Sequence, residues 1–248
     1  MENINQVSII GAGTMGNGIA HVFAQNGFKV VLIDINENCL KSGVENIKKN
    51  IDRQILKKQL KLSEKQSILS RIDTNNNLKN GVNSSHLIIE AATEDYDIKK
   101  KIFQELDNYA PKDAILATNT SSISITKLAA TTDRPAQVIG MHFMNPVPIM
   151  RLVEVIKGFT TSKSTVSTII KTVSDLDKIA IEVKDYPGFT ANRILLPMIN
   201  EAIYSLYEGV GNVRNIDKSM RLGANHPMGP LELADFIGLD TCLSIYSL

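Results

Sequence analysis

The sequence predicts an α/β fold with a mainly parallel sheet, followed by a smaller domain built only of helices. Two observations carry this prediction. Up to residue 185, short runs rich in β-branched residues alternate with helical patterns, which is typical of a parallel sheet with crossover helices. After Asp185-Tyr-Pro-Gly188 the alternation stops, and apolar residues recur at helical spacing. We therefore expect one domain at residues 1–185 and a second at residues 186–248.

The expected strands are short and apolar. The first two, Val7–Ile10 and Lys29–Asp34, flank a helix from about Met15 to Asn26 that Gly27 would close. Later strands are expected at Leu87–Ala91, Ala114–Thr118, Val138–Phe143, Leu152–Ile156 and Ile179–Val183. Helices are expected at about Ile98–Tyr109 and Ser164–Asp175, and in the second domain from Phe189 onward, at Asn215–Leu222 and at Leu231–Ile237.

Residues 36–71 interrupt the alternation with a long helical pattern. Apolar residues form one face of it, namely Val44, Ile47, Ile51 and Ile55. Basic residues recur every four positions on another face, namely Lys49, Arg53, Lys57 and Lys61. Ser63-Glu-Lys-Gln66 then reads as a capping box that opens a second helix. These patterns predict a helical hairpin that protrudes from the sheet domain.

Composition excludes several classes of function. The 248 residues carry a formal net charge of +1, which gives no general reason to expect nucleic acid or a membrane as partner. Cys39 and Cys242 are too few for a disulfide framework and show no metal-ligand spacing, so we expect no metal site. No apolar run approaches the about 20 residues of a membrane span, and the N-terminus lacks the pattern of a signal peptide. We expect a cytoplasmic protein.

A glycine-rich turn follows the first strand. Gly11, Gly13 and Gly16 form a G-x-G-x-x-G pattern between a strand and a helix, and Asp34 ends the next strand. This context predicts a doubly wound, Rossmann-type domain that binds a dinucleotide, with the pyrophosphate at the helix N-terminus. The residues expected at this cofactor site are Gly11, Ala12, Gly13, Thr14, Met15, Gly16 and Asp34. A purely structural glycine turn is the alternative.

Asp34 also predicts which cofactor binds. Its carboxylate could accept hydrogen bonds from the adenosine ribose but would repel a 2′-phosphate. No arginine follows within residues 35–39 to neutralise such a phosphate. We therefore expect NAD rather than NADP.

Among the four histidines, His142 stands apart. It falls near the C-terminal end of a predicted strand, which is where doubly wound folds bind their ligands. A nicotinamide enzyme that oxidises an alcohol needs a base of this kind to take the hydroxyl proton. His21 and His86 are better explained by packing or exposure, and His226 lies in a turn-rich segment without an obvious partner.

Several sequence blocks resemble one family. Asp185-Tyr-Pro-Gly-Phe-Thr-Ala-Asn-Arg193 is similar to the D-x-P-G-F-x-x-N-R signature of the 3-hydroxyacyl-CoA dehydrogenases. Further blocks resemble the same family in the same order: Asn119–Ser122, Met141–Pro148, Leu152–Ile156 and Gly223–Glu232. Within the family, the chain looks most like the bacterial enzymes that act on 3-hydroxybutyryl-CoA. The resemblance implies reversible NAD-dependent oxidation of a short-chain (S)-3-hydroxyacyl-CoA.

The resemblance also implies roles for individual residues. His142 matches the catalytic base, and Glu154 matches the carboxylate that orients it. Ser121 and Asn192 match polar residues that hold the substrate oxygen, Asn192 from the second domain. Further matches to cofactor contacts are Glu94, Lys99, Ser121 and Asn145, and matches to coenzyme A contacts are Asn50 and Lys57.

Each role has a simpler alternative. Glu154 could be a buried structural carboxylate, Ser121 a strand-end cap, and Asn192 a residue that only starts a helix. The lysines at 49–61 could form a solvated face. For the whole chain, the alternatives are a dehydrogenase of a sugar acid such as L-gulonate, or a nucleotide-binding protein without catalysis.

The chain ends at Leu248 within a predicted helix, Asp240–Leu248. Relatives in the resembled family continue beyond this point and dimerise through their helical domain. We therefore expect the helical domain to be incomplete here and the protein to form a homodimer through it.

Overall fold

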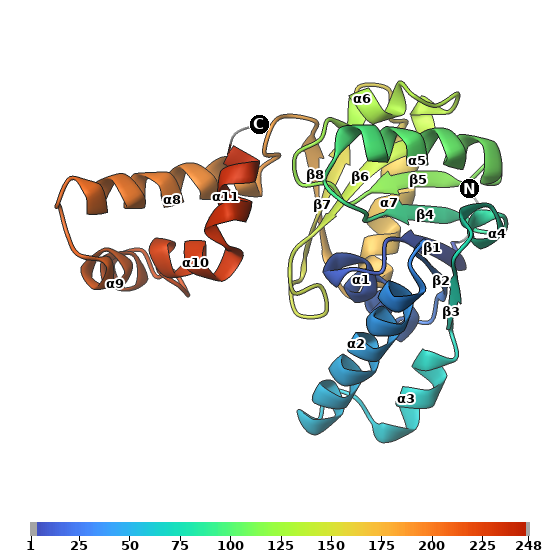
Figure 1. Ribbon diagram of the computed structural model, residues 1–248, viewed down its shortest axis with the longest axis horizontal. Coiled ribbons are helices and arrows are strands. Elements are labelled where there is room, and N and C mark those ends of the chain that lie inside the picture. The colour runs from blue at the N-terminus through green and yellow to red at the C-terminus, as the bar shows by residue number, and fades with distance from the viewer. Residues whose placement is uncertain (1–3, 247–248) are drawn as a thin grey trace. The chain divides into compact units, whose positions relative to one another are not determined.

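The computed structural model describes residues 4–246. Its first part is built around an eight-stranded sheet (Figure 1). Contacts divide the chain into two compact units, Met1–Asp185 and Tyr186–Leu248. In the first unit the strand order is β3-β2-β1-β4-β5-β6-β7-β8. All neighbouring strands run parallel except β6 and β7, which are antiparallel. The order from β3 to β6 is that of the dinucleotide-binding Rossmann fold, so the predicted fold class is confirmed.

The strands are β1 (Gln6–Ile10), β2 (Lys29–Ile33), β3 (Ile72–Asn75), β4 (Leu87–Glu90), β5 (Ile115–Thr118), β6 (Val138–Phe143), β7 (Leu152–Lys157) and β8 (Ile179–Lys184). The helices of this unit are α1 (Thr14–Gln25), α2 (Glu37–Leu56), α3 (Leu62–Leu69), α4 (Leu78–Val82), α5 (Tyr96–Tyr109), α6 (Ile125–Ala129) and α7 (Lys163–Asp175), with a 3₁₀ turn at Pro135–Gln137. The seven predicted strands are present within one residue at each end. β3, α4, α6 and the 3₁₀ turn were not predicted.

The sheet is buried on both faces at its centre. Every residue of β4, β5 and β6 is buried, which explains why their sequences are mainly apolar. Alternate strand residues such as Ile89 and Met141 share one core with side chains of α1, α2, α3 and α7. The intervening positions point to the opposite face, where a side chain at Gly140 would meet Ile125 of α6.

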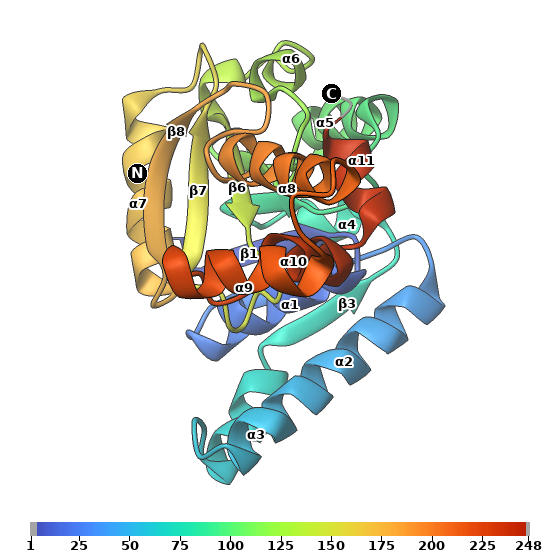
Figure 2. The same ribbon diagram turned by 90° about the vertical axis from the view of Figure 1, so that its left-hand side faces the viewer.

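The predicted hairpin is formed by α2 and α3, which extend away from the sheet side by side (Figure 2). The predicted capping box at Ser63–Gln66 is wrong. The helix begins two residues earlier, and the Glu64 carboxylate accepts a hydrogen bond from the backbone N–H of Lys61 at 2.7 Å. The four basic residues also do not share one helix, because Lys57 ends α2 and Lys61 precedes α3.

His21 is a fully buried residue of α1, as its expected packing role requires. Within the described residues, neither ring nitrogen completes a hydrogen bond, and the same holds for Oε1 of Gln54. Burial lowers the pKa of His21 to about 4, against a smaller opposing effect of Gln54 and Gln25. The folded protein therefore keeps this imidazole neutral at a pH where the unfolded chain would protonate it.

This difference predicts acid sensitivity. Between the unfolded pKa near 6.5 and the folded value of about 4, the unfolded state binds more protons, so stability falls as the pH falls. The full loss from His21 corresponds to about 3 kcal/mol. Urea unfolding from pH 7.5 to 4.5 measures it, with His21→Leu as the comparison. Parallel pH curves for the two proteins would show that His21 does not contribute.

The second unit consists of α8 (Ala191–Tyr207), α9 (Val213–Gly223), α10 (Pro230–Ile237) and α11 (Leu239–Tyr246). Its buried core is small and contains Leu196, Ile199, Ala234 and Cys242. Asp217 of α9 holds the first turn of α10, because its carboxylate accepts from the backbone N–H of Leu231 at 2.8 Å and of Glu232 at 3.2 Å. The helical character predicted for this part of the chain is confirmed.

Candidate functional site

The glycine turn lies between β1 and α1, beside the point where the strand order reverses. Gly11 has φ +96°, and a Cβ there would lie 2.6 Å from the carbonyl oxygen of Ala91. A Cβ at Gly16 would lie 1.7 Å from the carbonyl oxygen of Gly11. Both positions therefore require glycine, one for the turn and one for the close approach of the helix.

Gly13 differs from these two glycines. A Cβ there would meet no atom within 4 Å, so open space lies beside the backbone at this point. Gly13 is also the N-cap of α1 and supplies no side-chain cap, and the N–H groups of the first turn have no partner within the helix. An open cradle at the N-terminus of a twelve-residue helix fits the pyrophosphate of a dinucleotide.

Asp34 follows β2 and faces the turn. One carboxylate oxygen accepts from the backbone N–H of Ala12 at 2.9 Å, and the other accepts from that of Asn36 at 2.9 Å. The residue is half-buried, so further acceptor positions remain toward solvent. Asp34 thus fixes the glycine turn as well as offering a carboxylate to a ribose, and the sequence had suggested only the second role.

His142 and Glu154 face each other across the antiparallel strands β6 and β7, where they form a directly opposed pair. Nδ1 of His142 lies 2.9 Å from a carboxylate oxygen of Glu154, and both residues are almost fully buried. A carboxylate can only accept, so we assign the proton to Nδ1, which leaves Nε2 as the acceptor in the neutral ring.

Ser121 completes this arrangement. It lies in the loop after β5, and its Oγ is 3.0 Å from Nε2 of His142. The three side chains form a continuous line from Glu154 through the imidazole to the Ser121 hydroxyl. A base with one nitrogen fixed by a carboxylate and the other at a hydroxyl can take a proton from a substrate alcohol and return it.

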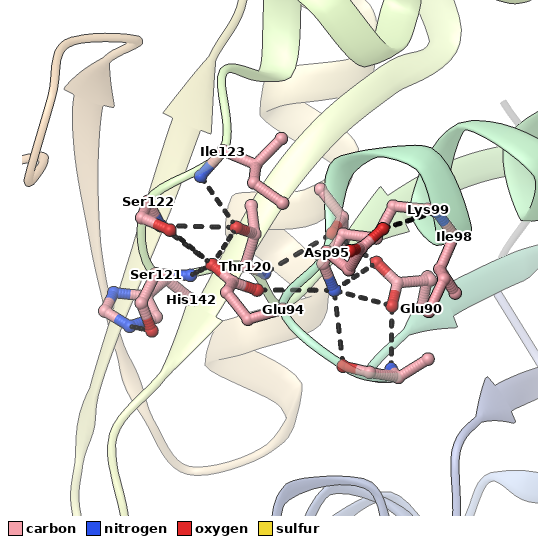
Figure 3. A network of polar contacts seen from close by, with 12 residues as sticks. Glu90, Glu94, Asp95, Ile98, Lys99, Thr120, Ser121, Ser122, Ile123 and His142 are labelled. Atoms are coloured by element: carbon pink, nitrogen blue, oxygen red, sulfur yellow. Dashed lines mark hydrogen bonds and ion pairs between the residues drawn. The ribbon is translucent and has the colours of Figure 1, made fainter. Parts of the chain in front are cut away.

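Two carboxylates hold the loop that carries Ser121. Glu94 accepts hydrogen bonds from residues 120–122, including the backbone N–H of Ser121 at 2.9 Å (Figure 3). Asp185 accepts from Oγ of Ser124 at 2.8 Å and from the backbone N–H of Thr126 at 2.8 Å. Asp185 had been interpreted only as part of a turn, and no local sequence signal links it to a loop 60 residues earlier.

Lys99 forms a buried ion pair with Glu90 and also lies near Glu94. Its Nζ lies 2.7 Å from one carboxylate oxygen of Glu90 and 2.9 Å from the other, and it also lies 3.4 Å from Glu94. Glu90 accepts further bonds from Thr118 and from the backbone N–H of Ala92. The sequence reasoning missed Glu90, although a glutamate at the end of an apolar strand is a signal because burial demands a partner.

Four further residues are expected at the site from the sequence. Asn145 is exposed and follows β6. Asn50 accepts from Arg53 at 3.3 Å, and Lys57 is exposed at the end of α2. Asn192 belongs to the second unit, where it lines a groove of about 350 Å³ beside Gly188.

The described residues, 4–246, contain no cluster of histidine, cysteine, aspartate and glutamate that could hold a metal ion. None of their helices combines the length and the apolar character needed to cross a membrane.

Comparison with known proteins agrees with the geometry. Residues 6–186 match the model of the 3-hydroxyacyl-CoA dehydrogenase NAD binding domain, and residues 188–248 match that of the C-terminal domain. A 3-hydroxybutyryl-CoA dehydrogenase of Bradyrhizobium diazoefficiens is 56% identical over 98% of this chain and 82% of its own length. Human mitochondrial hydroxyacyl-coenzyme A dehydrogenase is 40% identical over 96% of this chain and 77% of its own length.

Solved structures show the same relationship. The crystal structure of (S)-3-hydroxybutyryl-CoA dehydrogenase from Ralstonia eutropha superimposes with a TM-score of 0.95 and 48% identity, covering 99% of this chain and 86% of that one. The chain therefore belongs to the 3-hydroxyacyl-CoA dehydrogenase family of oxidoreductases, and its first domain is the NAD-binding domain of that family.

Proposed function

We propose that this chain catalyses the reversible oxidation of a short-chain (S)-3-hydroxyacyl-CoA, 3-hydroxybutyryl-CoA foremost, to the 3-oxoacyl-CoA. An acyl-CoA substrate is consistent with the family, and the relatives from Bradyrhizobium and Ralstonia carry names that specify the butyryl substrate. The observation that carries the proposal is the line of Ser121, His142 and Glu154, which provides an oriented base beside a hydroxyl group.

The proposed roles follow from this geometry. Nε2 of His142 takes the proton of the substrate C3 hydroxyl, while Glu154 holds Nδ1–H and stabilises the imidazolium that results. Ser121 donates to the substrate oxygen, and Asn192 of the second unit is proposed to do the same. When bound, NAD⁺ accepts the hydride that leaves C3. In the reverse direction, His142 returns the proton to the oxygen.

The cofactor is proposed to be NAD rather than NADP. Asp34 places a negative charge at the end of β2, beside the glycine turn, where a 2′-phosphate would be repelled. Thr14 and Met15 are proposed to offer backbone N–H groups, and Glu94, Lys99 and Asn145 to shape the rest of the site. In this arrangement, the buried Lys99 contributes its positive charge through its ion pair with Glu94.

Coenzyme A is proposed to contact the helical hairpin through Asn50 and Lys57. Exposed lysines near the end of α2 would suit the phosphates of coenzyme A.

A cytoplasmic location also stays a prediction from the sequence.

The second unit is proposed to bind a second copy of the chain. Several large apolar side chains of this unit are exposed, among them Tyr204, Tyr207, Val210 and Phe236. We propose that they contribute to the contact with the second copy, because apolar side chains exposed to water favour association. Light scattering at micromolar concentration measures the molar mass, and a value of one chain would contradict the homodimer.

The test of the proposed function is a NADH oxidation assay. We expect rapid turnover with acetoacetyl-CoA, slower turnover with longer 3-oxoacyl-CoAs, and weaker activity with NADPH. L-Gulonate with NAD⁺, followed as the formation of NADH, tests the sugar-acid alternative. Turnover of L-gulonate without turnover of acetoacetyl-CoA would contradict the proposal, and absence of both activities would favour a protein that binds the nucleotide without catalysis.

A further inference from the structure

The loop from Asn119 to Ser124 carries Ser121 but has little support from regular structure. β5 ends at Thr118 and α6 begins only at Ile125, so neither the sheet ladder nor a helix fixes the backbone between them. Ser121 and Ser122 are half-buried rather than packed in the core. The direction of the Ser121 hydroxyl therefore depends on the bonds that the loop makes with its surroundings.

Glu94 supplies four of these bonds through a single carboxylate oxygen. Oε1 accepts from the backbone N–H of Ser121 at 2.9 Å and of Ser122 at 3.1 Å. It also accepts from the hydroxyls of Ser122, at 2.7 Å, and of Thr120 (Figure 3). Because two successive N–H groups point at one oxygen, the backbone orientation at Ser121 is fixed, and the Cβ direction with it.

Glu94 is itself held in place by an ion pair with Lys99. Its Oε2 lies 3.4 Å from Nζ of Lys99, whose side chain is 1% exposed. Lys99 is anchored by Glu90, which is fully buried at the end of β4 and also accepts from Thr118. The ion pair that holds Glu94 therefore belongs to the sheet core, and Glu94 in turn fixes the loop relative to that core.

The charge of Glu94 suits this role. The side chain is 38% exposed, and its partial desolvation alone would raise the pKa of the carboxyl, but Lys99 and the bonds from residues 120–122 more than offset this and lower it. The group therefore remains an ionised acceptor throughout the neutral range. Hydrogen bonds to a carboxylate are stronger than those to a neutral acceptor.

We propose that Glu94 is a positioning residue that aims the Ser121 hydroxyl at His142, in addition to any contact with the cofactor. The bonds run from Glu94 to the Ser121 backbone, and from Oγ of Ser121 to Nε2 of His142 at 3.0 Å. Small displacements of a catalytic group cost large factors in rate, so an unsupported loop lowers turnover without removing any reacting group. This inference rests on the proposed function.

A double-mutant cycle with Ser121 tests the inference. In the parent enzyme, Glu94→Ala is expected to lower kcat for acetoacetyl-CoA reduction about tenfold at saturating NADH. In a Ser121→Ala background, the same substitution is expected to lower kcat by less than about twofold, because the hydroxyl that Glu94 positions is already gone. Glu94→Gln, which keeps the side-chain length and a carbonyl acceptor, is expected to give a smaller loss with the same dependence on Ser121. Glu105→Ala, an exposed change on helix α5, which follows Glu94 in the chain, is the control and is expected to leave kcat unchanged.

Two other outcomes contradict the positioning role. An equal loss in both backgrounds accompanied by weaker NADH binding would mean that Glu94 acts only on the cofactor. An equal loss with unchanged NADH binding would mean a general structural effect. A parent enzyme without activity toward acetoacetyl-CoA would instead overturn the proposed function. In that case the positioning role can still be tested without an activity measurement. If Glu94 positions Ser121, Glu94→Ala should shift the ¹⁵N resonance of His142 Nε2 toward its value in Ser121→Ala. An unshifted resonance would overturn the positioning role.

Discussion

Replacement of His142 by glutamine is expected to lower kcat for acetoacetyl-CoA reduction between about 100-fold and about 10 000-fold, the range of general acid–base catalysis. Glutamine fills a similar volume and can still contact Ser121, but it cannot carry a proton to the substrate oxygen. The glycine turn follows β1, whereas His142 lies on β6. The dissociation constant for NADH should therefore change less than about threefold. Stopped-flow turnover and a fluorescence titration of NADH measure the two quantities.

A matched substitution separates chemistry from damage to the fold. His86 precedes β4, at the end of the strand opposite to the proposed site, and its Nδ1 accepts from the backbone of Gln6 at 3.3 Å. His86→Gln is expected to keep nearly full turnover. Unchanged kcat in His142→Gln would remove the proposed base from the mechanism.

Replacement of Glu154 by glutamine is expected to lower kcat by about 100-fold to 10 000-fold, the range of general acid–base catalysis, with the upper end matching the loss when the orienting carboxylate of a Ser-His-Asp triad becomes an amide. The neutral amide cannot stabilise an imidazolium as the carboxylate does. If its NH₂ group faces Nδ1, it also forces the ring proton onto Nε2, where His142 could no longer accept. The pH–rate profile should change together with kcat, because the charge beside the base is lost.

Glu182→Gln provides the comparison for this variant. Glu182 lies on the neighbouring strand β8, opposite Val155 in the ladder, and is exposed. The same chemical change there should leave kcat and the pH–rate profile as they are. A Glu154→Gln enzyme that matches the parent in both measurements would disprove the dyad.

The fold could be predicted from the sequence where burial dominates. β4, β5 and β6 are buried throughout, and their apolar runs leave little choice of structure. β3 escaped prediction because it is a four-residue polar segment, Ile72–Asn75, with no fully buried residue. α4 and α6 have five residues each, too few to show a helical period.

The site could be predicted only where side chains fall at strand ends or match family blocks. The structure brings Ser121, His142 and Glu154 together as the sequence suggested. The bonds that Asp185 accepts from Ser124 and that Glu90 accepts from Thr118 could not be foreseen, because the paired residues lie 61 and 28 positions apart in the sequence. Periodicity reports which face a residue occupies, and it carries no information on which distant group a carboxylate will meet.

Because β6 and β7 pair in an antiparallel ladder, the segment that joins them must preserve their register. His142 and Glu154 meet because residues 144–151 return the chain in one register. A slip of one residue would turn the Glu154 side chain to the opposite face of the sheet, and a slip of two would carry it roughly 7 Å along the strand. Insertions in this connection are therefore compatible with the acid–base pair only when they bulge outward and leave the ladder in place.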